Sequence, residues 1–217
     1  MALLFQEQYK GNDKSTFFPA LEAMAGRLGT DPNLFMGMML LESGLNPQAR
    51  NSIRATGLTQ IMPDTALGLG TTVDALYYMT GTQQLKYIEK YFAPHKGKIQ
   101  NIYSLYMANF MPAHVDDIDN DSLVIGTGTN LSPNLIAMQN SGFDLNKNGV
   151  ITIGEFKEFI RRKFQNYPQI LSINSGGSLF SSKTTSILLA VGLMGAGVLG
   201  VWYMNDPNSF KKIFRFS

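Results

Sequence analysis

A single glutamate stands at the end of a strongly apolar segment and is followed by a turn-rich loop. Residues 33–41 are almost all apolar, and Asp31-Pro32 before them has the pattern of a helix N-cap with proline at the first helical position. Gly44 ends this predicted helix within a turn of Glu42. Burial at such a place disfavours the charged carboxylate, so we expect Glu42 to donate a proton near neutral pH.

A second set of residues has the spacing of a twelve-residue EF-hand loop. Oxygen ligands stand at loop positions 1, 3 and 5, glycine at 6, a backbone carbonyl at 7, a hydroxyl at 9 and a glutamate at 12. We expect a structural Ca²⁺ of modest affinity, because only the first and last ligands are charged; the alternative is a loop that keeps this geometry with little occupancy. The predicted metal ligands are Asp144, Asn146, Asn148, Val150, Thr152 and Glu155.

The residues from 42 to 66 resemble the lytic transglycosylases, lysozyme-like enzymes that cleave peptidoglycan. They match the family pattern Glu-Ser-Gly, Asn-Pro-x-Ala and Gly-Leu-x-Gln-Ile-Met-Pro-x-Thr-Ala in identity and spacing, and the resemblance extends over residues 17–112. It implies that Glu42 alone protonates the oxygen between N-acetylmuramic acid and N-acetylglucosamine. The same residue then takes the proton of the muramic acid 6-hydroxyl, which closes a 1,6-anhydro ring. The alternative for Glu42 is a place at the rim of an amphipathic core helix.

The resemblance also implies a set of sugar-binding residues. The family sequence Ala-Tyr-Asn-Ala-Gly near the end of the catalytic domain is altered here, since residues 105–112 read Leu-Tyr-Met-Ala-Asn-Phe-Met-Pro. The alternative to sugar binding is that Gln60 and Met62 only stabilise the loop and that Tyr106 only packs in the core. The implied substrate-binding residues are Ser43, Gln60, Met62, Tyr106 and Asn109.

Composition divides the chain into five parts and predicts a mainly α fold. Apolar residues recur at helical spacing over 17–28, 83–92 and 99–110, and convincing strand alternation is absent apart from a weak signal at 123–125. Residues 187–204 are 18 residues without a charge and would span roughly 27 Å as a helix, which favours a membrane span. The alternative is a buried hairpin helix of the soluble domain. The parts are a lysozyme-like helical domain (1–130), an EF-hand helix–loop–helix unit (131–167), a Ser/Gly-rich linker (168–183), a C-terminal transmembrane helix (184–204) and a basic tail (205–217).

Charge and cysteine content exclude several classes of function. Residues 1–130 hold nine Lys or Arg against twelve Asp or Glu, so a nucleic-acid footprint on the globular part is excluded. The chain has no cysteine, which rules out disulfides and thiolate metal sites. His95 and His114 lack metal-like spacing, and each is expected at the surface or in a turn. The first residues lack a basic start and a long apolar stretch, so no cleavable export signal is expected.

Together these features predict a membrane-anchored peptidoglycan lytic transglycosylase whose catalytic domain faces the glycan strands. We expect a phage protein that opens the wall locally from a virion membrane, with a bacterial envelope enzyme as the rival setting. Small residues every fourth position in the span favour helix–helix contacts there, or contacts within a capsid. Two other functions stay open: a hydrolytic muramidase of the goose-lysozyme type, and a non-catalytic structural or glycan-docking protein of the virion.

Overall fold

The computed structural model describes residues 2–175, and residue 1 and residues 176–217 lie outside the described part. The described part is mainly helical, as predicted, with isolated β-bridges in place of strands. Short 3-10 helices lie at Gln6–Gln8, Ala93–His95 and Pro112–Asp117. The α-helices are α1 (Lys14–Leu28), α2 (Pro32–Ser43), α3 (Pro63–Gly68), α4 (Val73–Tyr78), α5 (Gly81–Phe92), α6 (Ile102–Phe110), α7 (Pro133–Gln139), α8 (Ile153–Lys163) and α9 (Pro168–Leu171).

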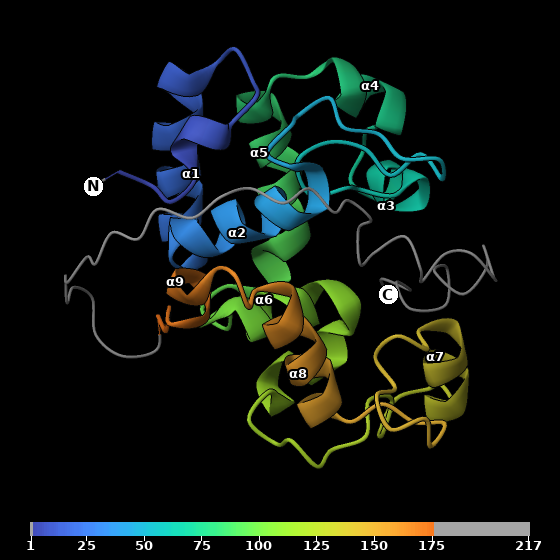
Figure 1. The fold of residues 1–217 in the computed structure, drawn as a ribbon. Coiled ribbons are helices and arrows are strands. Elements are labelled where there is room, and N and C mark those ends of the chain that lie inside the picture. Colours follow the sequence, from blue (N-terminus) through green and yellow to red (C-terminus); the bar gives the residue numbers. More distant parts are fainter. Residues whose placement is uncertain (1, 176–217) are drawn as a thin grey trace.

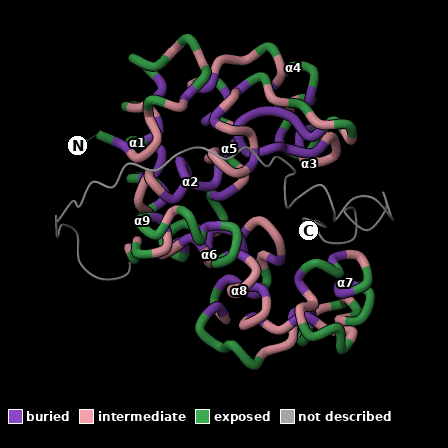
Figure 2. The backbone as a smooth tube through the Cα atoms, in the orientation of Figure 1, coloured by how far each residue is buried: buried purple, intermediate pink, exposed green. Residues whose placement is uncertain are grey.

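Helix α2 lies at the centre of the molecule and contacts α1, α6 and α9 (Figure 1). Its apolar residues surround the helix instead of forming one stripe, which is the pattern of a helix buried on all sides. The side chains of Leu34, Phe35 and Met39 are 0% exposed, and Figure 2 shows α2 buried along most of its length. Contacts on every side therefore fix the place of Glu42 in the last turn of α2.

Both ends of α2 are fixed by the residues that the sequence identifies. The Asp31 carboxylate accepts a hydrogen bond from the Asn33 N–H at 2.8 Å, as an N-cap does. Gly44 has a φ of 59°, and its N–H donates to the Leu40 carbonyl. Glycine is favoured there because a Cβ is strained in this left-handed conformation. The boundaries predicted for the helix that ends at Glu42 are therefore confirmed.

The predicted helix–loop–helix unit is present, with α7 before the loop and α8 after it. Residues 123–125 lie beside the end of this loop, where the Ile125 N–H donates to the Ile151 carbonyl at 2.8 Å. The strand expected over 123–125 is reduced to one isolated antiparallel bridge, between Val124 and Thr152. The loop therefore pairs its backbone with a distant segment of the same chain.

The linker predicted for residues 168–183 is wrong for its first part. Residues 168–171 form α9, in contact with α2, and the Ile170 side chain is 0% exposed. The contact is close, since a Cβ at Gly37 would lie 3.0 Å from Ile170 Cδ1. The buried Ile170 side chain thus packs the start of this segment against α2, although the serines and glycines of the segment indicate a linker. Residues 176–183 lie outside the described part.

The sequence predicts a surface or turn position for His114, but this side chain is only 3% exposed and lies in the 3-10 helix Pro112–Asp117. Its Nε2 accepts a hydrogen bond from the Gly126 N–H at 2.9 Å, and its Nδ1 lies 2.8 Å from the Asp117 carboxylate. An accepting Nε2 places the ring proton on Nδ1, which then donates to Asp117. The imidazole thereby ties the segment before the EF-hand unit to the 3-10 helix that follows α6. Helix α4 is a further element that the sequence does not lead us to expect.

The membrane-spanning helix predicted for residues 184–204, and the basic tail at 205–217, lie outside the described residues. Between residues 2 and 175, no helix combines the length and the apolar character needed to cross a bilayer. The span at 184–204 therefore stays a prediction.

Candidate active site

The carboxyl group of Glu42 is buried between α2 and α6. The residue is 7% exposed, and its Oε1 accepts a hydrogen bond of 3.3 Å from the Tyr106 hydroxyl. The other oxygen, Oε2, is buried and has no hydrogen-bond partner among residues 2–175. A buried carboxylate with one long hydrogen bond is poorly stabilised, whereas a protonated carboxyl is neutral and can itself donate. The surroundings therefore favour the acid form.

The pKa of Glu42 follows from this environment. Burial raises the pKa of Glu42 from 4.5 to about 7, and it outweighs the Tyr106 hydrogen bond and the positive charge of Lys163, both of which lower the pKa. A carboxyl with a pKa near neutrality is present in both forms, so it can give up a proton and take one back in one reaction cycle. Burial thus gives Glu42 a carboxyl that exchanges its proton near neutral pH.

Tyr106 is the predicted sugar-binding residue that contacts Glu42 directly. It is 2% exposed, and burial and the neighbouring carboxyl hold the pKa of its phenol well above the ordinary value. The hydroxyl therefore stays protonated and donates to Glu42. Its ring packs edge-on against Phe164, just after α8, with 5.9 Å between the ring centroids. From the sequence, the alternative to sugar binding for Tyr106 was core packing. In the structure the Tyr106 ring packs in the core and its hydroxyl also hydrogen-bonds to Glu42.

Ser43 and Gln60 hydrogen-bond to the backbone of the loop instead of to Glu42. Ser43 Oγ lies 2.9 Å from the carbonyls of Met39 and Leu58, so it joins the end of α2 to the loop. Gln60 is 5% exposed, and its amide nitrogen lies 2.9 Å from the Gly57 carbonyl. Both side chains shape the segment after Glu42, in agreement with the loop-stabilising alternative for Gln60.

Met62 and Asn109 lie where neither makes a hydrogen bond to the acid. Met62 is 7% exposed and precedes the first residue of α3 as its N-cap. Asn109 lies one helical turn after Tyr106, and its side-chain Nδ2 is buried without a hydrogen-bond partner in the described part of the chain. An amide donor and a carboxyl oxygen are therefore both left without partners on the helices that form this site.

Gln84 is a further residue of the site, and sequence reasoning missed it. This glutamine of α5 is 1% exposed, and its Oε1 accepts from the Leu58 N–H at 2.9 Å. Its Nε2 donates to the carbonyls of Pro47 and Leu76, at 2.7 and 3.0 Å. One amide thus joins two points of the loop, Pro47 and Leu58, to α4. The available signal was a polar residue on the apolar face of a predicted helix, which is buried only when hydrogen-bonded.

The loop predicted to bind calcium is held together by hydrogen bonds to the carboxylates at its two ends. The Asp144 carboxylate accepts from the N–H groups of Asn148 and Gly149, at 3.1 and 2.9 Å. The Glu155 carboxylate closes the loop by accepting from the N–H groups of Asn146 and Thr152, at 3.2 and 3.0 Å. In the part of the chain described, no three His, Cys, Asp or Glu residues gather as a metal-binding group. The donors here are two carboxylates with amide, carbonyl and hydroxyl oxygens, a set that suits Ca²⁺.

A cavity of about 520 Å³ lies beside this loop, lined by α7 residues such as Ala137 and Met138 and by Asp144 and Lys147 of the loop. Met138 is 75% exposed at its edge. Figure 1 shows α7 on the opposite side of the molecule from α1, with α8 between α7 and α2. The lining residues come from α7 and the loop that follows it, and Glu42 is not among them.

Comparisons with known proteins bear on the part of the chain around Glu42. Residues 20–97 match the family model described as the Transglycosylase SLT domain. Membrane-bound lytic murein transglycosylase C of Histophilus somni (strain 2336) is 33% identical over 104 residues, 48% of this chain and 26% of that protein. The protein of the same name from Actinobacillus pleuropneumoniae serotype 5b (strain L20) is 42% identical over 50 residues, 23% of this chain and 14% of that protein. No solved structure matches significantly.

The chain spans about a quarter of the length of the first of these curated relatives. The matched residues 20–97 include α2, the loop that follows it and Gln84, whereas Tyr106 and Asn109 lie beyond them. The chain is thus similar to the transglycosylase SLT domain over the segment that carries the buried carboxyl of Glu42.

Proposed function

We propose that the chain is a peptidoglycan lytic transglycosylase in which Glu42 is the single general acid and base. Glu42 gives its proton to the bridging oxygen as the bond between N-acetylmuramic acid and N-acetylglucosamine breaks. It then takes the proton of the muramic acid 6-hydroxyl as that oxygen bonds to the anomeric carbon. No water is consumed, and the product ends in 1,6-anhydro-N-acetylmuramic acid.

The observation that carries the proposal is the buried, singly hydrogen-bonded carboxyl of Glu42. Most glycosidases use two carboxylates, whereas the hydrogen-bond partner of Glu42 is a tyrosine. Burial raises the pKa of Glu42 to about 7, which suits a group that must act first as an acid and then as a base. The match of residues 20–97 to the transglycosylase SLT domain supports the same reaction.

Product analysis tests the reaction. Purified peptidoglycan is digested with the protein, and the released muropeptides are analysed by mass spectrometry. Anhydro ends support the proposal, whereas reducing ends formed by water support the hydrolytic muramidase instead. Glu42→Gln should lower the rate by about 10²-fold or more, while Glu22→Gln, at an exposed glutamate of α1, should leave it unchanged. Glycan binding without any cleavage by the wild type would favour a docking protein.

We also propose that the loop from Asp144 to Glu155 binds a structural Ca²⁺. The oxygen donor set and the carboxylates at both ends of the loop support this. Calcium should raise the melting temperature of the protein, because a ligand of the folded state stabilises it. A Glu155→Gln variant should lose most of this effect, and Glu158→Gln, one turn later on α8, should keep it. A melting temperature that does not respond to calcium or chelator would count against the site.

A membrane anchor at residues 184–204 is the third part of the proposal. The 18 uncharged residues from 187 to 204 support it, and the relatives matched by the chain are named membrane-bound. A phage protein that opens the wall from a virion membrane is the setting we favour over a bacterial envelope enzyme. Protease protection of this segment in vesicles tests the anchor, and labelling of purified virions with an antibody to the chain tests the setting.

A further inference from the structure

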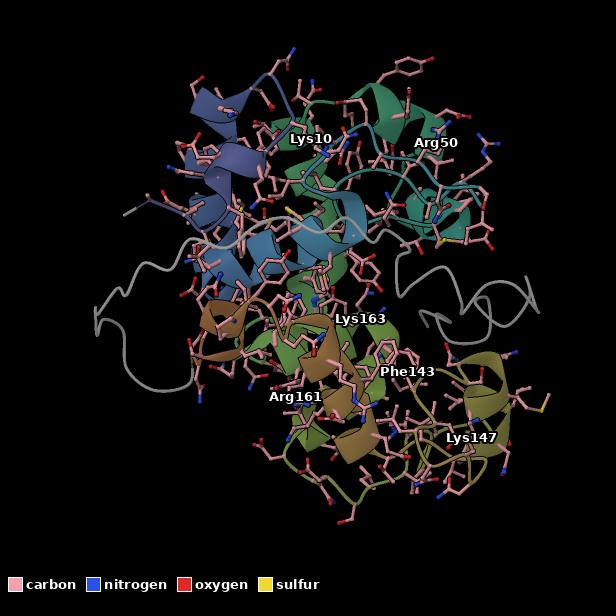
Figure 3. The ribbon with its side chains drawn as sticks, viewed as in Figure 1. Lys10, Arg50, Phe143, Lys147, Arg161 and Lys163 are labelled. Atoms are coloured by element: carbon pink, nitrogen blue, oxygen red, sulfur yellow. The ribbon has the colours of Figure 1, made fainter. Side chains whose placement is uncertain are left out.

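Phe164, the residue that follows α8, packs against the tyrosine that hydrogen-bonds to Glu42. Its side chain is 0% exposed, and its ring meets the Tyr106 ring at an interplanar angle of 71°, with 5.9 Å between the ring centroids. Figure 3 shows Lys163, the residue just before Phe164, at the end of α8 that faces α2. A residue of the predicted EF-hand unit therefore contacts the hydrogen-bonded pair of the candidate active site.

The place of Phe164 is fixed by a row of buried residues along one face of α8. Phe156, Ile160 and Phe164 follow one another four residues apart, which puts them on the same face of the helix, and each is 0% exposed. The Phe156 ring stacks on the Phe110 ring of α6, with 5.5 Å between the centroids. In the turn after α8, the Tyr167 N–H donates to the Phe164 carbonyl at 2.8 Å. Contacts along α8 and in this turn thus hold the Phe164 ring in place.

The Tyr106 hydroxyl depends on this packing because its hydrogen bond to Glu42 is long. The oxygen–oxygen distance is 3.3 Å, whereas a hydroxyl donor usually lies about 2.7 to 2.8 Å from its acceptor oxygen. A small rotation of the Tyr106 ring would therefore break the bond. Since Oε2 of Glu42 has no partner among the described residues, the carboxyl would then lack a hydrogen-bond donor from this part of the chain.

We propose that Phe164 is a positioning residue of the acid site, whose ring holds the Tyr106 hydroxyl within reach of the Glu42 carboxyl. This role rests on the proposed transglycosylase reaction, in which Glu42 is an anion between its two proton transfers. The Tyr106 hydroxyl donates to that anion, and Phe164 keeps the donor in place without touching the sugar. Phe164 lies outside residues 20–97, so the match to the transglycosylase SLT domain does not include it.

The variants that test this role remove the Phe164 ring and keep an apolar side chain. Phe164→Leu is the first, and Phe164→Met, with a longer unbranched side chain, is measured beside it so that a leucine variant that fails to fold does not end the test. Phe156→Leu is the matched control, because it removes an equally buried ring from the same helix, and that ring lies against Phe110 and Phe143 instead of Tyr106. Tyr106→Phe, which lacks the hydroxyl, is combined with Phe164→Leu in a double-mutant cycle.

The titration of the Glu42 carboxyl is followed by carbon NMR, with Glu42→Gln identifying its resonance, and the pH dependence of kcat/KM is measured on peptidoglycan. A carboxylate that loses a hydrogen bond has a raised pKa. We therefore expect the titration midpoint, and the alkaline limb of the rate profile, to move to higher pH in both Phe164 variants, by no more than in Tyr106→Phe. The Phe156→Leu midpoint should stay near the wild-type value. In the Tyr106→Phe background, Phe164→Leu should cause no further shift.

A midpoint that is unchanged or lower in the folded Phe164 variants overturns the proposal. An equal shift in Phe156→Leu also overturns it, as does a further shift when Phe164→Leu is added to Tyr106→Phe, because either result would reflect a general loss of packing. If the wild type releases no anhydro product, the proposed function fails, while the NMR titration still decides whether Phe164 positions Tyr106.

Discussion

At the scale of single residues, Glu42 and Tyr106 form a buried, hydrogen-bonded pair. The buried carboxyl makes the stability of the protein depend on pH, because burial raises the pKa of Glu42 from 4.5 to about 7. The folded protein then binds a proton more tightly than the unfolded chain does. This stabilisation is complete below pH 4.5 and is lost as the pH rises through about 7.

Replacing Glu42 by a neutral side chain should therefore stabilise the protein at high pH. We expect Glu42→Gln to be more stable than the wild type above pH 7, by up to about 3 kcal/mol, and the difference to vanish towards pH 4. Urea unfolding across this pH range measures it. Glu22→Gln serves as the control, since this glutamate is exposed. An equal pH dependence in wild type and Glu42→Gln would show that Glu42 is not buried as described.

Tyr106→Phe tests the hydrogen bond from the Tyr106 hydroxyl to the Glu42 carboxyl. The ring and its contact with Phe164 are kept, and only the donor to Glu42 is lost. Because this hydrogen bond lowers the pKa of Glu42, its loss should move the alkaline limb of the rate profile to higher pH. Tyr91→Phe, which removes a buried hydroxyl that donates to the Asn109 carbonyl instead, should leave that limb in place.

At the scale of elements, local signals predicted most helices, and contacts distant in sequence were missed. The cap at Asp31 and the glycine at Gly44 act within one turn, so the sequence shows where α2 begins and ends. Tyr106 and Glu42 lie 64 residues apart, and only the family resemblance suggested that they share a site. The four-residue α9 is too short to have a periodicity, so its single buried isoleucine gave no signal.

The loop after α2 should depend strongly on Gln84. In Gln84→Leu the Leu58 N–H and two carbonyls lose their buried partner, at a cost of at least about 2 kcal/mol. The loop that carries Gln60 should loosen, so activity should fall along with stability. Thermal unfolding and muropeptide release measure the two effects. Gln165→Leu, at an exposed position, is the control and should change neither.

At the scale of the whole molecule, the residues after 130 complete the core around Glu42. Phe156, Ile160 and Phe164 from α8 and its end are 0% exposed, as is Ile170 of α9. The boundary at residue 130 between a catalytic domain and an EF-hand unit stays a prediction, but α8 and α9 pack on α6 and α2 across it.

A fragment of residues 1–130 should therefore be unstable, because the apolar surfaces of α2 and α6 would face water. We expect it to aggregate or to show no cooperative unfolding, whereas residues 1–175 should unfold cooperatively. Circular dichroism during heating distinguishes these outcomes. A fragment that folds and cleaves peptidoglycan would show that α8 and α9 are dispensable for the site.

The pairing of residues 123–125 with the end of the proposed calcium loop has a consequence for how that loop would bind its ion. In a pair of EF-hands the two loops are joined by backbone hydrogen bonds, and through these bonds the binding of Ca²⁺ to one loop favours its binding to the other. Here the Ile151 carbonyl already accepts from Ile125 of the same chain. A calcium titration should accordingly follow a simple hyperbola with no cooperativity, and its midpoint should not vary with protein concentration.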